Sequence, residues 1–350
     1  MQQHEGTGKM NTGGQGLIGI TMGCPVGIGP EIILRFFAEL KAQCPYTPVV
    51  IGDMGQLERC ARELQIGVDI VPWLPDAPLE AGKLPVYEPA AGDGYLSDSP
   101  LWRWGEPNRE TGRAALAYIT AAVRLIKQGT LDGMVTGPIA KHAIQSAGCS
   151  FPGHTEMLAS LCGVKNYGMM MAGKRLKVSL VTIHTPFAQV PVQLTRVEIL
   201  RVINLTGETL SRDFGVSRAR IAVAGLNPHS GESGLFGEEE TKVIEPAVRE
   251  AATSRWQVSG PHPPDTVFMK ALANRYDAVV AMYHDQGLIP FKLIHFEDGV
   301  NVTMGLPMVR TSVDHGTAYD IAGRGVASAS SLAAAFFMAS DIIDNRKTNS

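Results

Sequence analysis

The chain has 350 residues, of which 45% are hydrophobic and 19% are charged, and its formal net charge at pH 7 is −3. This composition is typical of a soluble globular protein. The charge gives no reason to expect binding to nucleic acid or to a membrane surface. No apolar stretch reaches the ~18 residues that are needed to cross a bilayer.

Residues 1–16 are polar and glycine-rich, which predicts a disordered tail and not a secretory signal. The five cysteines are odd in number and contain no Cys-x-x-Cys pair. We therefore expect neither a disulfide framework nor a cysteine-bound zinc ion, and we expect a cytoplasmic location.

Apolar runs of strand length alternate with helical patterns from residue 17 onward. This alternation predicts an α/β fold with a largely parallel sheet. Residues 70–99 are rich in proline, glycine and acidic residues, and predict an irregular excursion with an antiparallel insert. The other predicted elements are strands at 17–21, 48–53 and 132–135, and helices at 30–37, 109–128, 195–214, 238–253 and 328–343, with one helix ending at 64 and another starting at 140.

Three further apolar runs each lead into a histidine. Residues 178–183 precede His184, residues 221–225 lead through a short turn to His229, and residues 278–283 precede His284. Such runs are typical of strands buried in a parallel sheet, and ligands bind beyond the carboxyl ends of these strands. A single histidine there is most often just a half-exposed polar residue. Three of them predict a divalent metal site with a coordination position left open for substrate.

Two glycine-containing turns leave their function open. Residues 23–31 match neither the G-x-G-x-x-G nor the Walker spacing; the loop either offers backbone N–H groups to an anion or makes a tight turn. His154 and Thr155 lie where a loop enters a predicted helix. They either hold a phosphate or carboxylate, or Thr155 simply caps the helix.

Several polar residues follow the predicted strands. Asp265 lies on a proline-rich loop, where it is either a carboxylate of the site or an ordinary turn residue. Lys292 follows eight residues after His284 on the same segment. Arg310 carries a planar fork suited to phosphate, although a surface ion pair is the default for a single arginine.

Five motifs together resemble the 4-hydroxythreonine-4-phosphate dehydrogenase family of pyridoxal phosphate biosynthesis. The resemblance runs from residue 18 to about residue 343, and the first loop departs from the family pattern at Cys24 and Val26. The motifs are Gly-His-Thr-Glu at 153–156, Asn-Pro-His-Ser-Gly-Glu at 227–232, Tyr-His-Asp-Gln-Gly at 283–287, Gly-Val-Asn-Val-Thr-Met-Gly-Leu-Pro at 299–307 and Arg-Thr-Ser-Val-Asp-His-Gly-Thr at 310–317.

The resemblance implies an isocitrate/isopropylmalate dehydrogenase-like α/β fold. We expect two α/β/α domains with the active site in the cleft between them. Residues 17–130 plus 300–345 would form the cofactor-side domain, and residues 131–299 the metal, substrate and dimerisation domain. Residues 315–325 resemble the adenosine-binding loop of that fold.

The resemblance also implies roles for individual residues. The metal, which is zinc, cobalt, manganese or magnesium, would be held at a site shared between the two subunits of a homodimer. Either Asp265 or a water molecule on the metal would act as the base. The implied residues are His184, His229 and His284 for the metal; His154, Thr155, Lys292, Asn301 and Arg310 for the substrate; His315, Gly316, Thr317 and Asp320 for NAD or NADP; and Asp265 and Lys292 for catalysis.

The implied activity is the NAD(P)-linked oxidation and decarboxylation of 4-phosphooxy-L-threonine to 3-amino-2-oxopropyl phosphate. Close relatives act instead on 4-phospho-D-threonate or 4-phospho-D-erythronate, and a further relative oxidises a dihydroxy-cyclohexadiene dicarboxylate. The departures at Cys24 and Val26 leave the choice of phosphorylated hydroxy acid open. More distant alternatives are a metal-dependent hydrolase and a non-catalytic binding protein. We expect neither nucleic acid nor a membrane as a partner.

Overall fold

A computed structural model describes residues 16–40, 44–90, 102–252 and 255–348. The chain divides into two compact units. Unit 1 runs to Pro152 and includes His315–Leu332, and unit 2 comprises Gly153–Asp314 and the chain from Ala333 onward. The disordered tail predicted at residues 1–16 lies outside the described residues, apart from Gly16, which begins the first strand.

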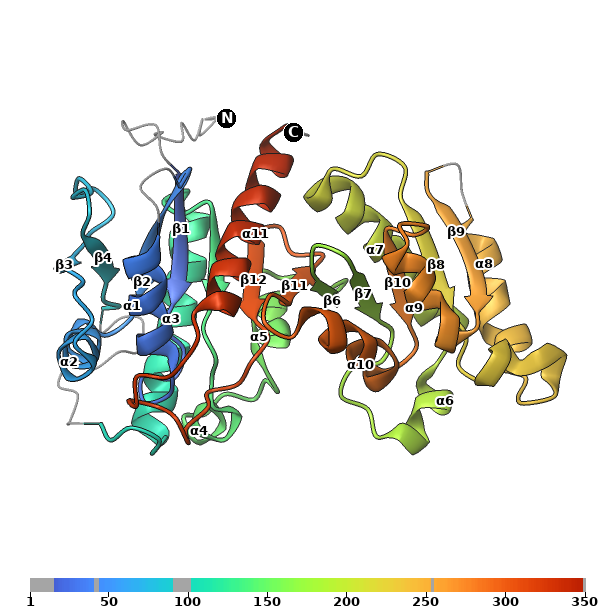
Figure 1. Ribbon diagram of the computed structural model, residues 1–350, viewed down its shortest axis with the longest axis horizontal. Helices are drawn as coiled ribbons and strands as arrows, with labels where there is room; N and C mark the ends of the chain where they lie inside the picture. Colours follow the sequence, from blue (N-terminus) through green and yellow to red (C-terminus); the bar gives the residue numbers. More distant parts are fainter. Residues whose placement is uncertain (1–15, 41–43, 91–101, 253–254, 349–350) are drawn as a thin grey trace, which may run out of the picture. The chain divides into compact units, whose positions relative to one another are not determined.

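Unit 1 contains a sheet of five parallel strands in the order β3-β4-β2-β1-β5 (Figure 1). The predicted parallel arrangement is confirmed here. The excursion after residue 70 contributes β3 and β4, but they pair in parallel, so the antiparallel insert predicted there is wrong. The elements are β1 (Gly16–Thr21), α1 (Gly29–Glu39), β2 (Tyr46–Ile51), α2 (Met54–Leu64), β3 (Ile70–Pro72), β4 (Leu84–Tyr87), α3 (Arg109–Lys127), β5 (Gly133–Thr136) and α4 (Lys141–Ser146).

Unit 2 contains a mixed sheet in the order β12-β11-β6-β7-β10-β8-β9. Strands β7, β10 and β8 are adjacent and parallel, as predicted for the three runs that lead into histidines. Strand β11 is antiparallel to β12 and β6, and β6 is antiparallel to β7. The strands are β6 (Gly168–Ala172), β7 (Lys177–Leu180), β8 (Arg220–Ala224), β9 (Gln257–His262), β10 (Ala278–Ala281), β11 (Val300–Met304) and β12 (Val309–Val313).

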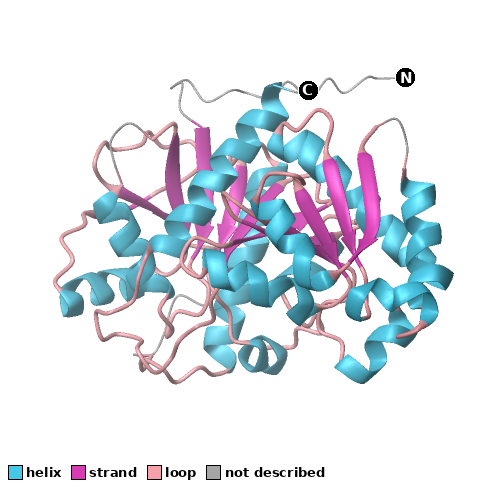
Figure 2. Cartoon of the chain, turned by 45° about the vertical axis from the view of Figure 1, so that its right-hand side comes forward, coloured by secondary structure: helices cyan, strands magenta, loops and turns pink. Residues whose placement is uncertain are grey.

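Helices lie on both faces of the sheet in unit 2, and Figure 2 shows the strands between them. Val178, Ala222 and Val279 pack with Phe268 of α9 and Phe291 of α10 in one apolar cluster. Since side chains alternate along a strand, Ser179 faces the other side, where Thr206 of α7 donates a hydrogen bond to it at 2.8 Å. The helical segments are α5 (His154–Leu161), η2 (Phe187–Gln189), α6 (Val190–Gln193), α7 (Arg196–Phe214), η3 (Pro228–Gly234), η4 (Glu240–Ile244), α8 (Glu245–Ala251), α9 (Pro264–Leu272), α10 (His284–His295) and α11 (Ser330–Thr348).

None of the helices in the described ranges is both long enough and apolar enough to cross a membrane.

The unit boundaries differ from the domain limits expected at 130/131 and 299/300. Strand β5 pairs with β1 and so belongs to the first sheet. Strand β11 joins the sheet of unit 2 through its antiparallel pairing with β6, and β12 joins it through its antiparallel pairing with β11. The cofactor and substrate roles assigned to the two domains remain predictions.

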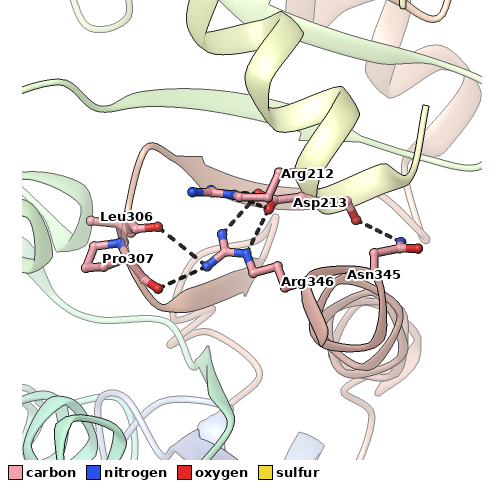
Figure 3. Close-up of polar contacts among 6 residues, drawn as sticks. All are labelled: Arg212, Asp213, Leu306, Pro307, Asn345 and Arg346. Carbon is pink, nitrogen blue, oxygen red and sulfur yellow. Dashed lines mark hydrogen bonds and ion pairs between the residues drawn. The ribbon is translucent and has the colours of Figure 1, made fainter. Parts of the chain in front are cut away.

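A buried ion-pair network fastens the end of α11 to unit 2 (Figure 3). The carboxylate of Asp213, only 1% exposed, accepts hydrogen bonds from Arg346 at 2.7 and 3.0 Å and from Arg212 at 2.7 and 3.2 Å. Asn345 donates to the carbonyl of Asp213, and Arg346 also donates to the carbonyl of Pro307. The ion pair of Asp213 with Arg346 therefore joins α7 to α11, and Arg346 joins both to the β11–β12 turn.

Replacing Asp213 with asparagine should lower the free energy of unfolding by about 3 kcal/mol, since it leaves two guanidinium groups without their anion. The exposed control Asp344→Asn on α11 should change it by less than about 0.5 kcal/mol. Urea unfolding of both variants measures the difference, and equal midpoints would contradict this role.

The same network predicts a pH dependence. Burial alone would raise the pKa of Asp213, but hydrogen bonds from Arg346 and Arg212 outweigh it and lower the pKa below its usual value. The stabilisation is therefore complete above the unfolded-state pKa of about 3.9 and is lost as pH falls through the lower folded-state pKa. The difference between wild type and Asp213→Asn should shrink below about pH 4.

Candidate active site

The three predicted metal-binding histidines follow adjacent parallel strands of unit 2. His284 begins α10 after the central strand β10, His184 follows β7 on one side, and His229 follows β8 on the other. The rings of His184 and His284 lie 6.2 Å apart, centroid to centroid. In the described part of the chain, no three His, Cys, Asp or Glu side chains are grouped closely enough to hold a metal ion.

The donor chemistry at this edge suits a divalent metal. With Zn–N distances of about 2.0–2.1 Å, two imidazoles at the separation of His184 and His284 are close enough to share one ion. His284 Nδ1 lies 2.7 Å from Asp285 Oδ1, the type of carboxylate contact that orients a ligating imidazole through its second ring nitrogen. His184 and His284 thus fit two positions of a metal site. The third position, predicted for His229, stays a prediction.

His229 lies in a left-handed turn. Residues 229–233 all have positive φ, between 43° and 78°, and only Gly231 among them is a glycine. Left-handed backbone costs roughly 1–2 kcal/mol for each non-glycine residue. Such strain persists only where the surroundings hold the backbone in place, and it is concentrated at functional sites.

A cavity of about 620 Å³ lies beside His229 and is also lined by Asp265, Phe187, Tyr283 and Gln286. Asp265 is in the first turn of α9, so it is a helix-start residue and also faces the cavity. The rings of Phe187 and Tyr283 meet edge to face with centroids 5.5 Å apart. The structure therefore brings a predicted metal ligand and the predicted base to one cavity.

Arg310 and His154 form a second polar group in unit 2. Arg310 on β12 is 2% exposed and donates to Thr303 Oγ1 on β11 at 2.8 Å, so it is not the exposed ion pair of the default interpretation. Burial lowers the pKa of Arg310 to about 9, partly offset by Glu156. Burial also lowers the pKa of His154 well below its usual value, and the charge of Arg310 adds to this effect. A buried cation and a half-buried, neutral imidazole therefore lie close together.

Two atoms near this group lack a hydrogen-bond partner among the described residues. They are His154 Nε2 and Asn301 Oδ1, both of which are buried. Buried polar atoms without partners are rare and point to a missing ligand or water. Thr155 is the second residue of α5, whose cap is Gly153 with no side-chain bond, so the interpretation of Thr155 as the cap is wrong.

Lys292 joins the helix of His284 to the strand of Arg310. It lies on α10, and its Nζ is 3.2 Å from Asp314 Oδ2, directly after β12. The lysine side chain is 41% exposed, so its ammonium group remains accessible to an anionic ligand.

In unit 1, the predicted cofactor loop packs on the glycine-rich loop. Thr317 O accepts from Ile28 N at 3.1 Å, and Tyr319 OH donates to Cys24 Sγ at 3.3 Å. A Cβ on Gly27 would lie 2.9 Å from Thr317 O. The N–H groups of Cys24, Gly27 and Ile28 all donate to backbone carbonyls, which favours the tight-turn interpretation of residues 23–31 over anion binding.

The other predicted cofactor residues lie on the same segment. His315 Nδ1 is 3.0 Å from Gly316 O, while its buried Nε2 has no partner among the described residues. Asp320 is exposed. Their role in NAD(P) binding remains a prediction.

His154 should stay neutral from pH 8 down past the ordinary histidine pKa of about 6.5, because burial and Arg310 lower its pKa. The ¹⁵N shifts of its ring, assigned by loss of the signals in His154→Gln, should not titrate over this range in the ligand-free protein. A midpoint near the ordinary value would contradict the buried geometry.

Sequence reasoning missed Glu240. The helix predicted from residue 238 begins with three glutamates, yet Glu240 is 1% exposed and accepts a hydrogen bond from Leu226 N in the loop before His229. Three successive glutamates gave no signal of which one is buried.

Comparison with known proteins identifies the family. The family described as pyridoxal phosphate biosynthetic protein PdxA matches residues 45–339. The chain belongs to the PdxA family. This confirms the resemblance drawn from the five motifs.

Individual relatives of this PdxA-family chain agree. It is 54% identical over 329 residues to the 4-hydroxythreonine-4-phosphate dehydrogenase of Desulfosudis oleivorans, covering 93% of this chain and 95% of that protein. It is 40% identical to an Oceanobacillus iheyensis protein provisionally named D-threonate 4-phosphate dehydrogenase, over 93% of this chain and 97% of the relative. The crystal structure of the Klebsiella pneumoniae 4-hydroxythreonine-4-phosphate dehydrogenase matches with a TM-score of 0.85 and 40% identity, over 94% of this chain and 100% of that one. The α/β fold class is confirmed.

Proposed function

We propose that this chain is an NAD(P)-linked, metal-dependent dehydrogenase that converts 4-phosphooxy-L-threonine to 3-amino-2-oxopropyl phosphate, a step of pyridoxine phosphate biosynthesis. Membership of the PdxA family and the names of its relatives support an oxidoreductase with a nicotinamide cofactor. The observation that carries the proposal is the buried Arg310 beside His154, together with Asn301 Oδ1, which has no hydrogen-bond partner among the described residues, in the same unit as the histidine pair.

The Arg310 group suits the phosphate of the substrate. A buried guanidinium is stabilised by an anion that accepts two parallel hydrogen bonds, and phosphate has this geometry. Neutral His154 can donate one further hydrogen bond, and the hydroxyl of Thr155 lies in the first turn of α5, where the helix dipole favours an anion. Lys292 would add a second positive charge. These residues bind and orient the substrate.

The reaction removes a hydride from C3 of the substrate to the nicotinamide and a proton from its hydroxyl to a base. The resulting 3-ketone then loses carbon dioxide. Asp265, in the cavity beside His229, is the chain's own candidate for accepting the proton. A divalent metal bound by His184, His229 and His284 would supply positive charge that lowers the pKa of the alcohol and stabilises developing negative charge.

We also propose that the active form is a homodimer with a shared metal site. Helix α10, which begins at His284 and carries Lys292, exposes Ile289 by 60% and Leu293 by 80%, and its C-cap residue Phe296 is 77% exposed. These residues recur at helical spacing and form an apolar stripe. A second copy of the chain covering this stripe would lie next to Lys292, the neighbour of Leu293 on α10.

Mixing experiments test the shared site. If His229 and His284 reach one site from different subunits, hybrids of inactive His229→Ala and His284→Ala chains contain one intact site, and part of the activity should return. All three pairwise mixtures of the histidine variants should be run, with subunit exchange shown by mass spectrometry of differently tagged chains. No recovery in any mixture despite exchange would contradict the shared site.

The activity is tested by following reduction of NAD⁺ and NADP⁺ with 4-phosphooxy-L-threonine, 4-phospho-D-threonate and 4-phospho-D-erythronate. We expect the highest kcat/KM with the first substrate, together with release of carbon dioxide. Preference for a D-sugar acid phosphate would assign the chain to the second candidate function, which is favoured by the Oceanobacillus relative. No reduction with any of the three would contradict a dehydrogenase of this type, and a hydrolase would release phosphate without changing the cofactor.

A further inference from the structure

The loop that presents His229 depends on groups outside itself. It leaves β8 at Ala224 and then turns left-handed over residues 229–233. Backbone bonds at the ends of this turn run from Ser230 N to Asn227 O at 3.1 Å and from Phe236 N to Gly231 O at 3.1 Å. A run of left-handed residues does not propagate as a stable helix of L-amino acids, so an anchor outside the turn helps to fix its direction.

Glu240 is that anchor. Its Oε1 accepts hydrogen bonds from the backbone N–H groups of Leu226 and Asn227, each at 2.7 Å, and its Oε2 accepts from Asn227 Nδ2 at 2.9 Å. All three donors are neutral amides just before His229. The carboxylate also lies against the centre of the turn, because a Cβ on Gly231 would be 2.6 Å from Glu240 Oε2.

The element that begins at Glu240 is unusual. Residues Glu240–Ile244 form a π-helical turn that leads into α8, and single π-turns inside helices are frequent at functional sites. Asn227 Nδ2 is also 2.8 Å from Glu239 Oε2. Two successive carboxylates, those of the N-cap residue Glu239 and of Glu240, therefore accept hydrogen bonds from the same side-chain amide.

Gln286 fixes the base of the same loop. It is 8% exposed, its Nε2 donates to Gly225 O at 2.7 Å, and its Oε1 accepts from Met282 N at 2.7 Å. It thereby joins the exits of β8 and β10. Glu240 accepts a hydrogen bond from the backbone N–H of Leu226, the residue directly after Gly225.

We propose that Glu240 is a positioning residue that holds the His229 imidazole in place for metal binding, with Gln286 as the second anchor of the loop. The inference rests on the proposed function, in which His229 is a metal ligand. It adds that the affinity for metal depends on a buried carboxylate that does not itself touch the ion. The Arg310 group lies on α5, β11 and β12 and should be unaffected.

The test compares Glu240→Gln with the matched control Glu238→Gln. Glutamine keeps the size of Glu240 but turns an N–H donor toward one of the three amides. Glu238 is exposed and pairs with Lys242 on the same segment. The probes are Zn²⁺ alone, measured by chelator competition with the intact protein, and the visible absorption of Co²⁺-loaded protein. We expect Zn²⁺ affinity to fall about 10–100-fold in Glu240→Gln with a weakened Co²⁺ band, and neither to change in Glu238→Gln.

A purely structural role would lower the melting temperature of Glu240→Gln but leave the Zn²⁺ affinity and Co²⁺ spectrum of the folded protein as in wild type, and this result would overturn the inference. If Glu240→Gln does not fold, Gln286→Glu is judged by the same two readouts, since it keeps the bond to Met282 but loses the donor to Gly225. The variant His229→Ala distinguishes a failure of the metal assignment from a failure of the positioning role. Native Zn²⁺ affinity in His229→Ala would refute the metal assignment itself, whereas loss there with native affinity in Glu240→Gln refutes only the positioning role.

Discussion

Replacing Arg310 with methionine is expected to lower kcat/KM for the phosphorylated substrate by about 10²–10³-fold, which corresponds to roughly 3–4 kcal/mol. Arg310 is buried on β12 and donates a hydrogen bond to Thr303, so the variant would lose the only buried cation of the proposed phosphate group among the described residues. Methionine is apolar and of similar length. Stability should therefore change little, because removal of a buried cation offsets the lost hydrogen bond.

The proposed contact can be tested from both sides, because the phosphate can be removed from the substrate and Arg310 can be removed from the protein. Wild type should strongly prefer 4-phosphooxy-L-threonine over 4-hydroxy-L-threonine, and Arg310→Met should lose most of this preference. The control is Arg196→Met, which removes an exposed arginine paired with Glu250 and should leave the preference unchanged. An Arg310→Met enzyme that keeps the full preference for the phosphorylated substrate would contradict the phosphate assignment.

Replacing His184, His229 or His284 with alanine should remove bound metal and lower kcat by at least about 10³-fold. The reason is that each imidazole would supply one of three protein ligands, and an open site with two ligands holds zinc weakly. Metal content by mass spectrometry, kcat and the unfolding midpoint should be measured on the same preparations.

The matched control for these variants is His142→Ala, which removes an exposed histidine from α4 of unit 1. It should retain metal and activity. Undiminished metal in all three site variants would contradict the assignment, and loss of metal together with unfolding would assign these histidines a structural role.

The sequence was most informative where local pattern and tertiary placement coincide. The runs before His184, His229 and His284 are buried β-branched segments, and the structure makes them adjacent parallel strands. Helices such as α3 (Arg109–Lys127) and α7 (Arg196–Phe214) lie close to the predicted limits, because their apolar residues recur at helical spacing and polar caps mark their starts.

The parts that the sequence could not predict depend on contacts between distant segments. Nothing local distinguishes β11 as an antiparallel partner of β6, and the unit boundaries therefore differ from the predicted domain limits. Local chemistry also failed at Thr155, where Gly153 is the cap, and at Glu240, whose role is defined by Leu226 and Asn227. The motifs predict the site residues as a set, but they do not predict that Arg310 and His154 lie together.

The most direct test of the account is cofactor reduction by metal-depleted and Zn²⁺-reloaded protein with 4-phosphooxy-L-threonine and its unphosphorylated counterpart. The account holds that the strand-end histidines and the Arg310 group act on one substrate. It therefore predicts rapid reduction only when both the metal and the phosphate are present, and a large loss when either is omitted. Full activity without metal, or equal turnover of the two substrates, would contradict it.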